Sequence, residues 1–376
     1  MTMGWVTGRS TRTGTPGPAR TVTVTRRRRG PHSRPRTVPA SVIAGTELLH
    51  IGGGETLPCP DAGRLPLTRA ALDAGLGTAR LALPPVRLHV LSDVVVHPGS
   101  RVVTTTDGMI VAESLATTVD SRVALDAKEL RSEPIHMDGT VAVFQGPLRS
   151  TFHTLLADLP RAGLLIHPVV SRLGTVRLLH GGPLSDVEAP LLAHRGSRRV
   201  ELVEVEPGRP VHADRVVLPG HATRTDVGAV PSWYRRWADA VALPPTENAP
   251  RRVFLDDAAG SGRVRERGEV LEMLEARGVG VVDPSRTDPA VLFGILRDAE
   301  LVVGASRDAL AGCLFSRRAH VIELSDAATV DPAIYYLAAS KGLPYDVVTS
   351  PSASSRHGEP VLDLATLDRL LERRSG

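Results

Sequence analysis

The fold of this 376-residue chain is decided by residues 252–304, which run RVFLDDAAGSGRVRERGEVLEMLEARGVGVVDPSRTDPAVLFGILRDAELVVG. Three short apolar runs in this stretch predict β-strands, at 253–255, 279–282 and 301–303. Each run is separated from the next by a segment with helical signals. Asp288-Pro289 is a typical helix start, and Gly278 is a typical helix end. The stretch therefore predicts strands that alternate with helices.

The same alternation continues beyond residue 304. Further strands are predicted at 321–324 and 345–348, and the helix between them begins at Asp331-Pro332. Short apolar strands that alternate with helices of ~10–15 residues indicate a parallel sheet with both faces covered. We therefore predict a Rossmann-like domain. In such a sheet ligands bind at the carboxyl ends of the strands, where the following helices present amides to anions.

Upstream of this domain the pattern is less regular but similar in kind. Between residues 86 and 113, the turn pairs Pro98-Gly99 and Asp107-Gly108 separate β-branched runs and predict a small β meander. A short helix is predicted over 151–161, ending near Pro160. Strands and helices then alternate up to residue 242, and LPPTENAPR (243–251) indicates a linker. We thus expect an N-terminal α/β domain that includes the meander over 41–245, and a C-terminal Rossmann-like domain over 246–376.

Residues 1–40 form a basic arm that holds nine arginines and no acidic residue. Of the 45 basic residues in the chain, 36 remain for the rest, against 41 acidic residues, so the body is mildly acidic. The arm has too few apolar residues to offset the entropy of ordering, and we predict that it is disordered. The run Arg26 to Arg29 could contact phosphates of nucleic acid or of an anionic lipid surface. A solvated tail is the simpler interpretation.

Composition excludes several other classes of protein. No apolar run reaches the ~18–20 residues of a transmembrane helix. Cys59 and Cys313 are too few for a disulfide framework or a cysteine-rich zinc site. The 13 histidines show no metal-ligand spacing, so no metal site is predicted. A reducing, cytoplasmic setting is the expectation, and a peripheral contact with the inner face of the membrane stays open.

Several segments carry a resemblance to a known family. Residues 252–348 resemble the domain of glycosyltransferase family 61, with an arginine-containing loop after the first strand, then EVLEMLEARGVGVVDP (269–284), AELVVG (299–304), LF (314–315) and VIEL (321–324). Upstream, FHTLLADLPR (152–161) is similar to the family's His-Trp-Leu-Leu-Asp-x-Leu-Pro-Arg motif. The meander end TTTDGMIVAES resembles the segment that precedes this motif in the family. In order along the chain, the resemblance covers roughly residues 86–350.

The resemblance implies a GT-B-like architecture, with two Rossmann-like domains facing a cleft. It further implies transfer of a sugar from a nucleotide-sugar donor to a hydroxyl of a glycan or cell-envelope acceptor, with inversion and without a metal or other cofactor. His153 would be the catalytic base, with Asp158 in reserve. The donor would be bound by residues that follow the strands of the second domain: Arg263, Gly304, Ser306, Arg307 and Glu323.

Two rival hypotheses remain. The family's Gly-x-His-Gly-Ala-x-Leu-x-Asn segment corresponds here to residues 304–312, GASRDALAG, which lack the histidine and the asparagine. A relative that binds but does not catalyse is therefore the first alternative. The second alternative, from a different class of protein, is binding of nucleic acid through the arginine-rich arm, which the simpler interpretation of the arm disfavours.

Overall fold

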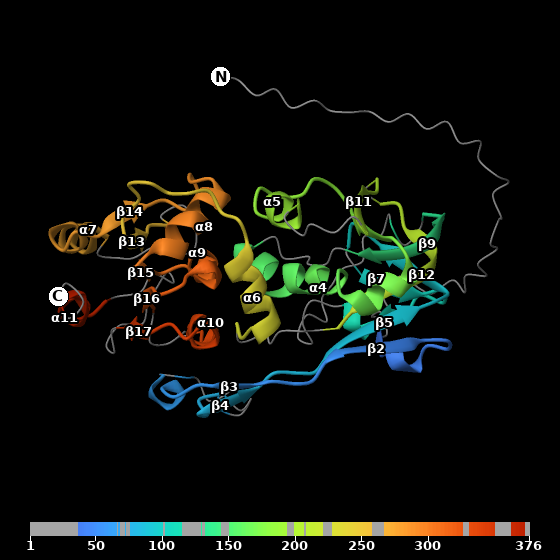
Figure 1. Ribbon diagram of the computed structural model, residues 1–376, viewed down its shortest axis with the longest axis horizontal. Coiled ribbons are helices and arrows are strands. Elements are labelled where there is room, and N and C mark those ends of the chain that lie inside the picture. The colour runs from blue at the N-terminus through green and yellow to red at the C-terminus, as the bar shows by residue number, and fades with distance from the viewer. Residues whose placement is uncertain are drawn as a thin grey trace, which may run out of the picture. The chain divides into compact units, whose positions relative to one another are not determined.

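The structure is a computed structural model, shown in Figure 1, that describes the chain between residues 37 and 372 with gaps. The gaps fall at 66, 68–71, 73–75, 101, 115–128, 130–131, 144–149, 194–198, 207, 221–227, 258–266, 326–330 and 350–361. Most of the basic arm lies outside the described residues. Its last residues are already part of the fold, because β1 (Thr37–Val38) pairs with β8 (Ile110–Val111) and Ala40 is buried. Residues 35–376 form one compact unit.

The described residues place ten strands in the first sheet. Besides β1 and β8 these are β2 (Glu47–Gly52), β5 (Val86–Leu91), β6 (Val94–His97), β7 (Val102–Thr105), β9 (Ile135–Val143), β10 (Val176–His180), β11 (Val200–Glu204) and β12 (Val211–Pro219). Four of them are parallel and lie side by side in the order β11-β10-β9-β12. Numbered along the chain this order is 3-2-1-4, the order of half of a Rossmann fold. The other strands add an antiparallel part to the sheet.

The antiparallel part contains the predicted meander, with one difference. Strands β6, β7 and β8 pair consecutively, as expected. Residues 86–96, however, contain a further break at Asp93, where φ is 57°, in addition to the two predicted turns. Strand β5 therefore pairs with the end of β12 around Val216, and β6 pairs with its beginning at Val211. The long strand β12 thus aligns both strands, which no local sequence signal could show.

The second sheet confirms the prediction for the last third of the chain. It consists of β13 (Arg252–Leu255), β14 (Gly280–Val282), β15 (Leu301–Gly304), β16 (His320–Leu324) and β17 (Tyr345–Val348). All neighbouring strands are parallel, in the order β14-β13-β15-β16-β17, or 2-1-3-4-5 along the chain. The helices of this part are α7 (Arg267–Ala276), α8 (Pro289–Asp298), α9 (Arg307–Leu310), the 3-10 helix η7 (Ala311–Phe315), α10 (Ala333–Lys341) and α11 (Leu364–Glu372). As predicted, Asp288 caps α8, accepting a hydrogen bond of 2.8 Å from Ala290 N.

The helix predicted over 151–161 extends further than expected. It comprises α3 (Thr151–His153), the π-helical turn η4 (Thr154–Asp158) and α4 (Leu159–Leu164). Pro160 does not end it, contrary to our prediction. Because the π turn changes the hydrogen-bond spacing just before the proline, Pro160 occupies the first turn of α4, where a missing N–H is tolerated.

The remaining elements complete the fold. They are η1 (Ala40–Val42), η2 (Ala62–Arg64), η3 (Ala112–Ser114), η5 (Pro168–Leu173), α5 (Glu188–Ala193), α6 (Ser232–Ala240) and a hairpin of β3 (Thr56–Pro58) with β4 (Arg80–Ala82). One hydrophobic core joins residues of both sheets, such as Leu88 and Leu255, with helical residues such as Leu155 and Phe315. The protein is thus an α/β protein with a mixed and a parallel sheet. Among the described residues, no helix combines the length and apolarity needed to cross a membrane.

Candidate functional site

Each sheet has a place where the strand order reverses, and such places bind ligands in open parallel sheets. In the second sheet the reversal lies between β13 and β15, which pair Leu255 with Gly304 at their carboxyl ends. In the first sheet it lies between β9 and β12. Among the candidate residues, Gly304 is the last residue of β15. Ser306 and Arg307 follow that strand end along the chain, and His153 follows the end of β9.

The chain segments that follow the two reversal points touch each other. The backbone N–H of Phe152, in α3, donates a hydrogen bond of 3.1 Å to Oδ1 of Asp308, in α9. The Arg307 guanidinium lies over the Phe152 ring, 4.5 Å from its centroid. These residues are 156 positions apart in the sequence. The fold therefore brings the motif around His153 next to the segment that begins at Gly304.

His153 occupies the last position of α3, and its imidazole is held by its own helix cap. Nδ1 lies 2.7 Å from Oγ of Ser150, the N-cap residue, which also accepts a hydrogen bond from the His153 N–H. The ring meets that of Phe152 edge to face, with the centroids 5.5 Å apart. The side chain is half-buried. One ring nitrogen is thus oriented by a hydroxyl, an arrangement that a general base needs.

Gly304, Ser306 and Arg307 take different parts at the end of β15. Gly304 pairs with Glu323 of β16, and a Cβ at Gly304 would lie within 3.1–3.2 Å of the Leu310 side chain, so the close packing there favours glycine. Ser306 is buried, and its Oγ caps α9 by accepting from Ala309 N at 3.4 Å. Arg307 is partly exposed, and its Nη1 lies 2.6 Å from Oδ2 of Asp331. Arg307 is therefore the member of this group that can reach a ligand in solvent.

Glu323 is buried at the end of β16 beside these residues. Burial raises the pKa of its carboxyl to about 7, against the hydrogen bond of 2.7 Å that the Tyr345 hydroxyl donates to it. The negative charge of Asp331 raises this pKa further, and Arg307 lowers it. Asp331 and Arg307, which form an ion pair, are thus close enough for their charges to act on Glu323. A carboxylate that titrates near neutral pH is typical of functional sites.

Replacement of Glu323 with glutamine is expected to stabilise the protein at high pH. Folding raises the pKa of Glu323 from 4.5 to about 7. The contribution of this group to stability is therefore present below pH 4.5 and is lost as the pH rises through 7. The gain in unfolding free energy for Glu323→Gln at pH 8 should be on the order of 3 kcal/mol at most, and it should vanish near pH 4. Urea unfolding at both pH values measures it. The matched change Glu275→Gln, on the exposed face of α7, should alter the unfolding free energy at neither pH.

An ion pair that the sequence did not reveal lies at the neighbouring strand end. Asp256 follows β13 and is buried, and its Oδ1 accepts a hydrogen bond of 3.1 Å from Nε of Arg267, at the start of α7. This pairing raises the pKa of Arg267. The sequence signal was present, because an Asp-Asp pair follows a strand, but its partner is found only across the loop. Arg263, the predicted donor-binding residue of that loop, lies outside the described residues.

Asp158, the reserve base, is placed in a different environment from His153. It is buried at the end of the π turn, and its charge acts on Arg161 and Tyr234, which are also buried. Burial lowers the pKa of Arg161 to about 10, while the carboxylates of Asp158 and Glu113 oppose this shift. The Arg161 guanidinium is hydrogen-bonded to the carbonyls of Pro219 and Glu113. Asp158 and Arg161 therefore belong to the buried packing beside the first sheet, an environment different from that of the half-buried His153.

A cavity of about 170 Å³ lies elsewhere, between α5, the linker and α8. It is lined mainly by apolar side chains, such as Leu191, Val241 and Phe293, and shares no lining residue with the candidate site. This cavity has few polar side chains, so the candidate site is defined by the residues at the strand ends.

Comparison with protein-family models finds no match for the chain. Comparison with curated proteins likewise finds none.

Proposed function

We propose that this protein is a glycosyltransferase of GT-B-like architecture, which transfers a sugar from a nucleotide-sugar donor to a hydroxyl of a glycan or cell-envelope acceptor. The observation that carries the proposal is the contact of Phe152 with Arg307 and Asp308. It joins the motif that contains His153, the expected base for the acceptor hydroxyl, to the expected donor-binding segment that begins at Gly304. The strand orders 3-2-1-4 and 2-1-3-4-5 agree with two nucleotide-binding types of sheet.

The proposed chemistry needs a cation for the leaving diphosphate and a base for the acceptor hydroxyl. Arg307 supplies the cation, since a guanidinium binds phosphate oxygens through charge-assisted hydrogen bonds. To do so it exchanges its partner Asp331 for the phosphate. Glu323, one strand further, accepts hydrogen bonds from the ribose hydroxyls. His153 accepts the proton of the acceptor hydroxyl as this oxygen attacks the anomeric carbon, and the nucleoside diphosphate leaves from the opposite face.

The first test is binding of nucleotides to variants of Arg307. We expect a nucleoside diphosphate and its sugar conjugate to bind the wild-type protein in isothermal titration calorimetry. Because hydrogen bonds to charged groups contribute about 1.5–3 kcal/mol, Arg307→Ala should weaken binding roughly 10–100-fold. Asp331→Asn keeps the hydrogen bond to Ala333 N but removes the competing negative charge, so it should leave binding unchanged or tighten it.

Arg318 offers a matched control on the same sheet. It precedes β16 at the opposite, amino-terminal edge and is paired with Glu300. Arg318→Ala should not change nucleotide affinity. If no uridine, guanosine, adenosine or cytidine diphosphate and no corresponding nucleotide sugar binds the wild-type protein, the proposal is wrong. Equal losses of nucleotide affinity in Arg307→Ala and Arg318→Ala would show that the nucleotide does not bind at Arg307.

A second candidate function, a binding protein without transferase activity, is favoured by the compensation of charge at the site. Arg307 is paired with Asp331, and Asp256 is paired with Arg267. The segment that begins at Gly304 also lacks the family's histidine. This candidate predicts donor binding with neither transfer nor hydrolysis, as measured by mass spectrometry of the products. Measurable turnover would exclude it.

A further inference from the structure

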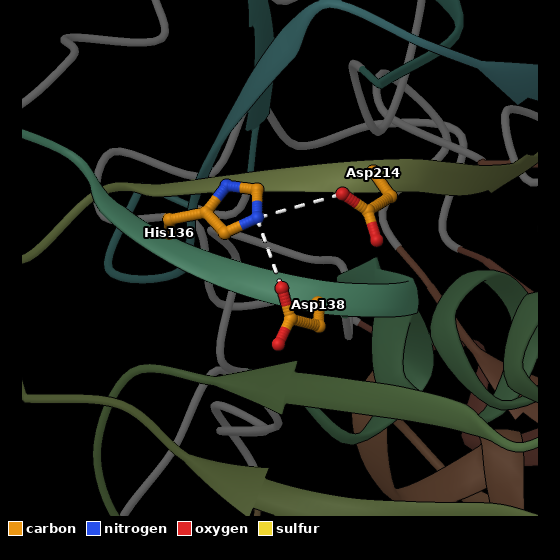
Figure 2. A group of neighbouring side chains, drawn as sticks. All are labelled: His136, Asp138 and Asp214. Carbon is orange, nitrogen blue, oxygen red and sulfur yellow. Dashed lines mark hydrogen bonds and ion pairs between the residues drawn. The ribbon is translucent and has the colours of Figure 1, made fainter. Parts of the chain in front are cut away.

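Two neighbouring strands of the first sheet carry a mixed cluster of one imidazole and two carboxylates, shown in Figure 2. His136 and Asp138 lie near the beginning of β9, and Asp214 lies on β12. The proposed catalytic residue His153 follows the opposite end of β9, so the cluster is separate from the candidate site. All three side chains are exposed to solvent and can be reached by an ion.

The possible ligand atoms of the cluster lie close to one another. Nε2 of His136 lies 3.2 Å from Oδ1 of Asp138 and 3.5 Å from Oδ1 of Asp214. One ligand atom from each of the three residues lies within 4.8 Å of the other two. Ligands at 2.0–2.2 Å from a tetrahedrally coordinated zinc ion are separated by roughly 3.3–3.6 Å. The two distances from the imidazole, 3.2 and 3.5 Å, are close to this separation.

The charges of the cluster also favour a cation. Two carboxylates approach one ring nitrogen, and Nε2 carries at most one proton, which it donates to one carboxylate at a time. A divalent cation would interact with all three groups at once. The nearby Arg177 is positively charged but is directed to other groups. Its Nη1 donates a hydrogen bond to the backbone carbonyl of Asp138, and its Nε lies 3.9 Å from Oε2 of Glu201.

The backbone around the cluster fixes the direction of the carboxylates. The pairing of β9 with β12 shifts register between Ala213 and Arg215, on either side of Asp214. Gly139 has a φ of +85°, and its N–H donates a hydrogen bond of 2.7 Å to Oδ2 of Asp214. The second oxygen of Asp214 is thereby held while Oδ1 faces His136. Contacts of this kind orient the ligands of metal ions in proteins.

A second histidine and a third aspartate stand beside the cluster. His212 is the cross-strand partner of His136, and the two ring centroids are 5.8 Å apart. Nε2 of His212 lies 3.7 Å from Oδ1 of Asp93. The surroundings of the cluster are thus rich in groups that bind transition metals, and they contain no thiolate among the described residues.

We propose that His136, Asp138 and Asp214 bind one divalent first-row transition cation of the zinc type. One nitrogen and two oxygen ligands suit Zn²⁺, Co²⁺ or Mn²⁺ better than Ca²⁺ or Mg²⁺, which prefer oxygen alone. Three protein ligands leave at least one coordination position to water or to a small anionic ligand. The ion would link β9 to β12 across a bulge and would therefore stabilise the folded protein.

The experiment uses the untagged full-length protein, freed of metal by a chelator. Titration with Co²⁺, followed by visible absorption, should show saturable binding at a ratio of one to one, and Zn²⁺ should displace the Co²⁺. Asp214→Asn keeps an acceptor for the Gly139 N–H but removes the anionic ligand. Because changes in groups that only support the ligands weaken binding about 10–100-fold, Asp214→Asn and His136→Gln should weaken it at least as much.

Two further measurements separate loss of the site from loss of the fold. His50→Gln removes an exposed histidine from β2 and should leave Co²⁺ affinity unchanged. Circular dichroism should show the same fold for all the variants, and Zn²⁺ should raise the melting temperature of the wild type and of His50→Gln only. Absence of saturable binding by the wild type, or equal affinity in His136→Gln and the wild type, would overturn the proposal. This outcome is independent of nucleotide binding.

Discussion

Replacing His153 with alanine is expected to lower the turnover number of donor hydrolysis or transfer by about 10²–10⁴-fold, the usual contribution of a general base. The side chain does not belong to the donor-side group, so the affinity for the nucleotide should stay within about threefold of the wild type. Mass-spectrometric detection of free sugar or of the glycosylated product measures turnover, and calorimetry measures affinity.

The control for this prediction is His50→Ala, which removes an exposed histidine from β2. Its turnover should equal that of the wild type. Ser150→Ala removes the hydroxyl that lies 2.7 Å from Nδ1 of His153 and should cause a smaller loss than His153→Ala itself. Wild-type turnover that survives His153→Ala unchanged would show that the base is another residue. It would leave the proposed donor site untouched.

Replacing Arg161 with alanine is expected to lower the free energy of unfolding by about 3–5 kcal/mol, because removal of one partner leaves an uncompensated charge in the interior. Arg161 is buried beside Asp158, and its guanidinium satisfies the carbonyls of Pro219 and Glu113. A typical domain is stable by only 5–15 kcal/mol. The midpoint of urea unfolding should therefore fall steeply.

Arg236 provides the matched control, since it lies on the exposed face of α6. Arg236→Ala should change the unfolding free energy by no more than about 0.5 kcal/mol. The double variant Arg161→Met with Asp158→Asn removes both charges and should recover a large part of the stability that Arg161→Ala loses. If Arg161→Ala is as stable as Arg236→Ala, the charges of Arg161 and Asp158 do not contribute to the stability of the protein. Asp158 would then regain its interest as a candidate base.

The motif at 152–161 shows that two residues of one local pattern can lie in different environments. His153 and Asp158 are five positions apart, within the single motif FHTLLADLPR. The π turn between them widens the helix, and it leaves the imidazole beside Ser150 while the carboxylate enters the core next to Arg161. The sequence predicted both as candidate bases. The difference in burial, which separates them, depends on packing against β12 and α6.

The candidate metal cluster illustrates a second limit of sequence patterns. His136 and Asp138 alternate along one strand, and no metal motif was predicted from them. Their third partner, Asp214, becomes visible only when β9 and β12 pair, and Asp214 meets Gly139 from 75 positions away. Sequence spacing reports ligands that share one helix or loop, and it does not report ligands contributed by neighbouring strands.

The sequence by itself determined the second sheet, with its five parallel strands and the cap at Asp288. Hydrophobic periodicity and helix caps are local signals, and each such element is encoded by its own residues. Only the tertiary structure decided that Phe152 meets Asp308, that Glu323 is buried with a pKa of about 7, and that Asp256 is paired with Arg267. These contacts join segments that follow different strands. Their energies arise from desolvation and from charges brought together in space, which no run of neighbouring residues specifies.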